Sequence, residues 1–193
     1  MAVTETTTVT RDHDGAEVPL AGQYTVDASH SEVAFVARHL VVARTRGTFG
    51  SFEGSVTIAE DPTQSSLEAV VDLGSVDTRD AGRDEHLRSA DFFDVATHPT
   101  WTFRSTKVTG SGSDWTVEGE LTIAGITRPV VLETELVGTQ QDPWGNERVG
   151  FNARTEINRE DWGLTWNAAL ETGGFLVGKT VKVELEVEAV RQG

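Results

Sequence analysis

The closing segment of the chain alternates apolar and charged side chains with a period of two. The apolar residues are Val181, Val183, Leu185, Val187 and Ala189. The charged residues between them are Lys182, Glu184, Glu186 and Glu188. Successive side chains of an extended strand point to opposite faces, so one face here is apolar and the other charged. The segment is therefore predicted to be a half-buried β-strand.

The same alternation recurs along the chain, between turns that contain Gly, Pro, Asp and Ser. The pattern predicts strands at 23–28, 31–38, 47–58, 67–76, 100–108, 115–123, 130–138, 149–157 and 181–189. So many strands, with little helix to cover an open sheet, favour closure, because closure removes the exposed edges on which sheets aggregate. We predict an all-β fold, a single antiparallel β-barrel of about eight or nine strands with one or two short helices.

Two segments interrupt the alternation. Residues 81–93 contain helix-forming side chains and follow Asp80, which can cap the first turn, so a short helix is expected there. A second helical turn is expected at 39–43. The first 21 residues are rich in Thr and acidic groups and have few large apolar side chains. We interpret 1–21 as a flexible N-terminal leader and 22–193 as one barrel domain.

Charge and composition exclude several classes of protein. The 193 residues include 31 acidic and 16 basic side chains, a net charge of −15 that repels phosphate backbones, so nucleic acid is not an expected partner. The N-terminus lacks the basic start and apolar run of a secretion signal, and no apolar stretch reaches about 18 residues. We expect a cytoplasmic protein that does not span a membrane. The chain has no cysteine, which removes thiol chemistry and Cys-ligated metals.

Motifs for catalysis and for nucleotide or metal binding find little support. The segment 173–180, GGFLVGKT, matches a phosphate-binding loop, but that mechanism needs a helix after the loop, and here a strand follows. The five histidines show no metal-binding spacing, so no metal is expected. The chain has no nucleophile elbow. Asp84 and His86 are the one candidate acid–base pair, and neighbours of this kind also arise by chance on so acidic a surface.

Aromatic residues are the remaining signal. Two explanations stay open for them, because the interior of a barrel of about eight strands is either filled by side chains or holds one small or elongated ligand. Small residues on the strands would leave room for a cavity: Ala34, Ala37, Gly47, Gly50, Gly119 and Ala153.

Seven segments taken together resemble the YceI-like family: VDASHSEVAFVARHL (26–40), RGTFGSFEG (46–54), RDEHLRSADFFD (83–94), LTIAGITRPV (121–130), DPWG (142–145), INREDWGLTWN (157–167) and GGFLVGKTVKVELEVEAV (173–190). The resemblance extends in order from Tyr24 to Val190. It implies a lipocalin-like antiparallel barrel that binds a long polyisoprenoid or similar amphiphile in its pore. It implies no catalytic residues and no cofactor besides the bound lipid, so we expect a binding protein rather than an enzyme.

The resemblance leads us to expect ligand contacts, at the head group or in the pore, from Arg38, His39, Arg83, His86, Phe92, Phe93, Trp101, Asn158, Trp162, Trp166 and Asn167. The acidic balance favours a neutral head, such as a quinone, over a diphosphate. The expected role is sequestration or transport of a quinone or polyprenyl lipid. A scavenger of unrelated hydrophobic molecules, such as antibiotics or fatty amides, and an enzyme acting on a bound lipid remain as alternatives, and a homodimer is left open.

Overall fold

The computed structural model describes residues 9–40, 42–169 and 176–193. Eight antiparallel strands close into a ring through the pairing of β12 with β13, which confirms the predicted barrel. In ring order the strands are β3 (Gly22–Val26), β6 (Phe52–Ile58), β7 (Ser66–Asp72), β9 (Thr100–Ser111), β10 (Asp114–Ile123), β11 (Ile126–Gln141), β12 (Glu147–Asn158) and β13 (Val177–Arg191).

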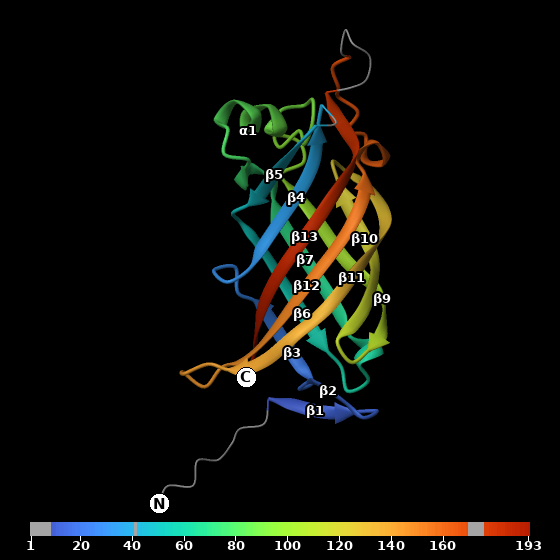
Figure 1. The fold of residues 1–193 in the computed structure, drawn as a ribbon. Helices are drawn as coiled ribbons and strands as arrows, with labels where there is room; N and C mark the ends of the chain where they lie inside the picture. Colours follow the sequence, from blue (N-terminus) through green and yellow to red (C-terminus); the bar gives the residue numbers. More distant parts are fainter. Residues whose placement is uncertain (1–8, 41, 170–175) are drawn as a thin grey trace, which may run out of the picture.

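Three further strands extend the wall from β13: β4 (Glu32–His39), β5 (Ala43–Phe49) and β8 (Val76–Asp77). The helix α1 (Ala81–Arg88) lies at one end of the barrel, near β4 and β5 (Figure 1). At the opposite end lies a separate hairpin of β1 (Thr10–His13) and β2 (Ala16–Pro19). Short 3-10 turns are η1 (Pro62–Gln64), η2 (Leu73–Ser75) and η3 (Arg159–Trp162). Among the residues described, no helix has the length and apolar character needed to cross a membrane.

The period-two pattern builds the barrel interior. On β13, Val183 and Ala189 are buried while Lys182 and Glu186 are exposed. Ala189 lies opposite Val149 of β12, and the register keeps the apolar rows of neighbouring strands on the same face. The outer row of charges forms ion pairs across the strands, such as Lys182 with Glu156 at 2.9 Å.

The interior at the α1 end is packed solid by aromatic and branched side chains. The Trp101 ring centroid lies 5.0 Å from that of Phe49 and 5.4 Å from that of Phe93, and Leu87 of α1 packs against the same cluster. Two of the glycines expected to leave room for a cavity, Gly47 and Gly119, do not leave it. A Cβ added at Gly47 would lie 2.4 Å from the Phe35 ring, and one added at Gly119 would lie 2.4 Å from the Phe103 ring, because these rings already occupy the space. The predicted pore is therefore filled at this end.

The predicted boundaries of individual helices and strands agree with the structure in some places and differ in others. Asp80 caps α1 by accepting a hydrogen bond from the Arg83 N–H at 2.9 Å, as predicted. The helix ends at Arg88 rather than 93, because Ser89 donates both its N–H and its hydroxyl to the His86 carbonyl and stops the turn. The predicted helical turn at 39–43 is wrong: β4 ends at His39 and β5 begins at Ala43, in a hairpin. The predicted strand 47–58 is divided into β5 and β6 by a bend.

The segment 1–21, predicted to be a flexible leader, contains ordered structure. Residues 1–8 lie outside the described part of the chain, but β1 and β2 form a paired hairpin. Two of its apolar residues, Val18 and Pro19, are buried, and Ala16 is partly buried. The side chains of Val18 and Pro19 lie against apolar surface at the end of the barrel, a tertiary contact that local composition does not show. The division into a leader at 1–21 and a barrel domain at 22–193 stays a prediction.

Candidate functional site

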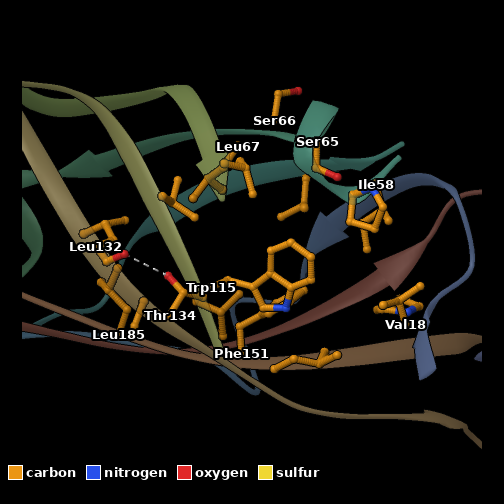
Figure 2. Close-up of a pocket in the computed structure, with 18 residues that line it drawn as sticks. Val18, Ile58, Ser65, Ser66, Leu67, Trp115, Leu132, Thr134, Phe151 and Leu185 are labelled. Carbon is orange, nitrogen blue, oxygen red and sulfur yellow. Dashed lines mark hydrogen bonds between the residues drawn. The ribbon is translucent and has the colours of Figure 1, made fainter. Parts of the chain in front are cut away.

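An apolar cavity of about 120 Å³ occupies the barrel interior at the end that the β1–β2 hairpin covers (Figure 2). It lies among side chains of β6, β7 and β9 to β13, with η1 at its edge. Its lining consists of Val18, Pro19, Val56, Ile58, Pro62, Ser65, Ser66, Leu67, Val108, Trp115, Val117, Leu132, Thr134, Leu136, Phe151, Ala153, Leu185 and Val187.

Trp115 lies at the centre of this lining. Figure 2 shows its indole between Val18 and Ile58 on one side and Leu132 and Leu185 on the other. The indole N–H donates to the Gly112 carbonyl at 2.9 Å, a contact within its own hairpin. Because that donor is already paired, Trp115 offers a bound molecule only apolar surface.

Two of the three hydroxyl-bearing side chains in the lining, Ser65 and Thr134, also form hydrogen bonds. The Ser65 hydroxyl accepts a hydrogen bond from the Ala59 N–H at 3.1 Å. The Thr134 hydroxyl donates to the Leu132 carbonyl at 3.4 Å, the dashed line in Figure 2. The 18 lining residues include no ionisable side chain. The cavity can therefore hold an apolar group, and its lining supplies neither an acid nor a base.

A second, more polar hollow of about 420 Å³ adjoins the cavity and shares Val18 and Leu136 with it. The remaining lining residues come from β1, β2, the β9–β10 turn and β11: Thr10, Glu17, Gly112, Ser113, Gly138 and Thr139. They present hydroxyls and one carboxylate and include no Lys or Arg. We call this hollow the vestibule.

None of the eleven residues expected to contact a ligand lines the cavity. Six of them belong to two aromatic clusters at the α1 end of the barrel. Phe93, Trp101 and Trp162 are buried in the aromatic core, where the Trp162 N–H donates to the Leu121 carbonyl at 3.1 Å. His86, Phe92 and Trp166 form a partly buried cluster, with the His86 and Trp166 ring centroids 4.5 Å apart.

The other five expected residues lie on α1 or along the wall. Arg83 donates to the Thr78 hydroxyl and carbonyl at 2.7 and 2.8 Å. Asn167 clamps Val177 of β13 through both its amide nitrogen and its oxygen. Asn158 caps η3, Arg38 is exposed on β4, and His39 is half-buried at the end of that strand. Contact between these residues and a ligand stays a prediction.

The alternative acid–base pair is not formed. Asp84 is buried and accepts hydrogen bonds from the Thr78 N–H and hydroxyl at 2.9 and 2.6 Å. His86 instead contacts Asp91 at 2.9 Å. The segment GGFLVGKT lies partly outside the described residues, and its described end enters β13 rather than a helix, so the nucleotide-binding geometry is missing there.

One cluster within the described chain has the composition of a metal site. The ligand atoms of Asp27, His30 and Glu188 lie within 4.8 Å of one another. However, Arg148 already bonds to Asp27 and Glu188, and its Nε donates to Asp142 at 2.8 Å. A guanidinium in this position opposes a second cation. We interpret the cluster as an ion-pair network that ties the β11–β12 turn to the wall.

The network lowers the pKa of two carboxyls. Hydrogen bonds from Ser29, Arg148 and His30 hold the pKa of Asp27 well below its usual value. Burial raises the pKa of Asp142, but hydrogen bonds from Asn146, Arg148 and the Trp144 N–H outweigh it and leave that pKa well below normal.

Sequence reasoning named one residue of the cavity lining, Ala153, and missed the rest, although the signal was present. Leu185, Val187 and Ala153 occupy the apolar rows of the predicted strands, and Trp115 begins another. The rows predicted an interior, but they did not show which end of it stays empty.

Comparison with known proteins supports the fold. The family model described as the YceI-like domain matches residues 24–189. A UPF0312 protein of Pectobacterium carotovorum is 38% identical over 176 residues, which is 90% of this chain and 88% of that protein. The crystal structure of BcnA from Burkholderia cenocepacia has a TM-score of 0.74 at 23% identity and covers 84% of this chain and 98% of its own. A polyisoprenoid binding domain from Saccharophagus degradans has a TM-score of 0.65 at 20% identity and covers 88% and 98%.

Proposed function

The chain belongs to the YceI-like family, and we propose that its barrel domain, residues 22–193, binds an isoprenoid or similar amphiphile with the apolar tail in the cavity beside Trp115. The observation that carries the proposal is the cavity itself, which is lined almost wholly by apolar side chains from seven barrel strands and from β2. Empty apolar cavities of this kind stay dry and take up apolar molecules. The polyisoprenoid binding domain of Saccharophagus degradans has the same fold, which supports the same class of ligand.

The cavity volume limits how much of a tail it holds. A cavity of about 150 Å³ accommodates benzene, so about 120 Å³ suits roughly one five-carbon isoprene unit. At about 0.8 kcal/mol per buried carbon, one unit contributes about 4 kcal/mol, which corresponds to a millimolar dissociation constant. Tighter binding requires more of the tail to be buried, and therefore a movement that enlarges the cavity.

The polar end of the ligand is proposed to lie in the vestibule. Its lining holds Thr10, Glu17, Ser113 and Thr139 and no cationic side chain. A diphosphate needs Arg or Lys donors, whereas an alcohol, quinone or amide needs only neutral partners. The proposed ligand is therefore an uncharged prenyl compound, held for sequestration or transport.

A second candidate is a less selective carrier of hydrophobic molecules. The Trp115 N–H and the hydroxyls of Ser65 and Thr134 are already hydrogen-bonded within the protein, which leaves the cavity few directional contacts and favours loose selection. Titration with antibiotics and fatty amides of similar size distinguishes the two. Affinities equal to those for prenyl alcohols would favour this candidate.

The test of binding is mass spectrometry of organic extracts from protein purified without detergent, followed by titration with short prenyl alcohols. We expect a stoichiometric apolar compound in the extract and saturable binding of the added alcohols. Absence of both would refute the proposal.

A further inference from the structure

The β1–β2 hairpin closes the end of the barrel at which the cavity lies. It forms a separate two-stranded sheet that shares no ladder with the barrel strands. Figure 1 shows it beneath the barrel, at the opposite end from α1. It also precedes residues 24–189, the part that the family model matches. The barrel and the element that closes it are thus distinct parts of the chain.

Two residues of β2 form part of the cavity wall. Val18 has 2% of its surface exposed, and Pro19 is also buried. Both line the cavity, and Val18 also lines the vestibule. The opposite end of the interior is filled by the aromatic core. A longer tail therefore gains volume most directly where Val18 and Pro19 now lie.

The hairpin is held to the barrel by a few contacts at its edges. Arg11 of β1 donates to the Ala59 carbonyl at 2.7 Å and lies 3.9 Å from the Glu60 carboxylate. Arg191 donates to the Ala21 carbonyl at 2.7 Å, just after β2. In both arginines the Nε–H is buried and has no hydrogen-bond partner among the described residues. An unpaired buried donor carries a desolvation cost, so this junction is weaker than its number of contacts suggests.

We propose that the β1–β2 hairpin determines the length of the tail that the barrel accepts, with Val18, which lines both the cavity and the vestibule, as the limiting residue. The inference rests on the proposed function and deepens it. With the hairpin seated, the cavity holds about one isoprene unit, and further units gain no apolar contact. When the hairpin is displaced or its side chains are shortened, the pore lengthens and additional units become buried.

The experiment measures dissociation constants of full-length protein for prenyl alcohols of two, three and four isoprene units. The variants are Val18→Ala, which shortens the side chain between the cavity and the vestibule, and Arg11→Ala, which weakens the hairpin junction without changing the lining. Val131→Ala is the matched control, because Val131 is half exposed on the outer face of β11. Thermal melting monitors the fold of each variant.

In the unmodified protein we expect the three alcohols to bind within about threefold of one another, because added units find no room. Val18→Ala should strengthen binding of the longer alcohols by about tenfold, the value of two carbons' additional burial, and leave the shortest nearly unchanged. Arg11→Ala should strengthen the longer ones by about threefold or more. Val131→Ala should match the unmodified protein.

Two results would contradict the proposed role of the hairpin, and they differ in what they imply for the proposed function. If all proteins bind the alcohols with the same dependence on length, the hairpin does not set tail length, and the proposed function stands. If the unmodified protein and every variant bind none of them, the proposed function fails as well. Should Val18→Ala unfold, Arg11→Ala decides alone, because it leaves the lining unchanged.

Discussion

Filling the cavity from its wall is the most direct test of where a tail lies. Ala153 of β12 faces the interior and packs with Val108, Val117 and Leu132. The substitution Ala153→Leu adds three carbons to a cavity that holds about five, so it removes about 2.4 kcal/mol of tail burial. That loss corresponds to about a 50-fold weaker affinity for a short prenyl alcohol.

The same substitution should affect the free protein in the opposite direction. Filling an existing apolar cavity commonly stabilises a protein by about 0.5–2 kcal/mol. We therefore expect a higher melting temperature together with weaker binding, a combination that a merely damaging substitution does not produce. Isothermal titration with a two-unit prenyl alcohol and thermal melting measure the two effects.

Ala43→Leu is the matched control, because Ala43 is exposed at the start of β5. It should change neither quantity appreciably. If Ala153→Leu binds the alcohol as tightly as the unmodified protein while remaining folded, the tail does not occupy this cavity, and the assignment of the site to this end of the barrel is wrong.

Three further predictions concern stability. Gly119→Ala places a Cβ 2.4 Å from the Phe103 ring and should cost about 1–3 kcal/mol in urea denaturation, whereas Gly50→Ala, with its nearest atom at 3.8 Å, should change little. Asp84→Ala leaves the buried Thr78 N–H without its acceptor and should cost about 1–3 kcal/mol while leaving the lipid in the extract unchanged; an altered lipid would favour catalysis. Asp27 and Asp142, which bond to Arg148, have a lower pKa in the folded state than in the unfolded chain, so their ionised forms stabilise the fold above pH about 4. This stabilisation is lost as the pH falls further. Arg148→Met should therefore flatten the acid dependence of the melting temperature between pH 6 and 3.

The barrel could be predicted because each strand carries its own evidence. The alternation on β13 shows which of the two faces each side chain from Val181 to Ala189 occupies, without reference to any other segment. The cap at Asp80 is equally local. The hairpin at 10–19 is the opposite case, since its order depends on two side chains finding the end of a barrel built by residues much later in the chain.

The distribution of empty space inside the barrel is also non-local, which explains why the small residues misled. Gly47 and Gly119 looked like room for a ligand, yet the rings of Phe35 and Phe103 fill the space above them. Ala153 belongs to the same class of residue and does border the cavity. The difference lies in the side chains on neighbouring strands, and strand register decides which of them come close. A small residue in a barrel therefore indicates a cavity only once its cross-strand neighbours are known.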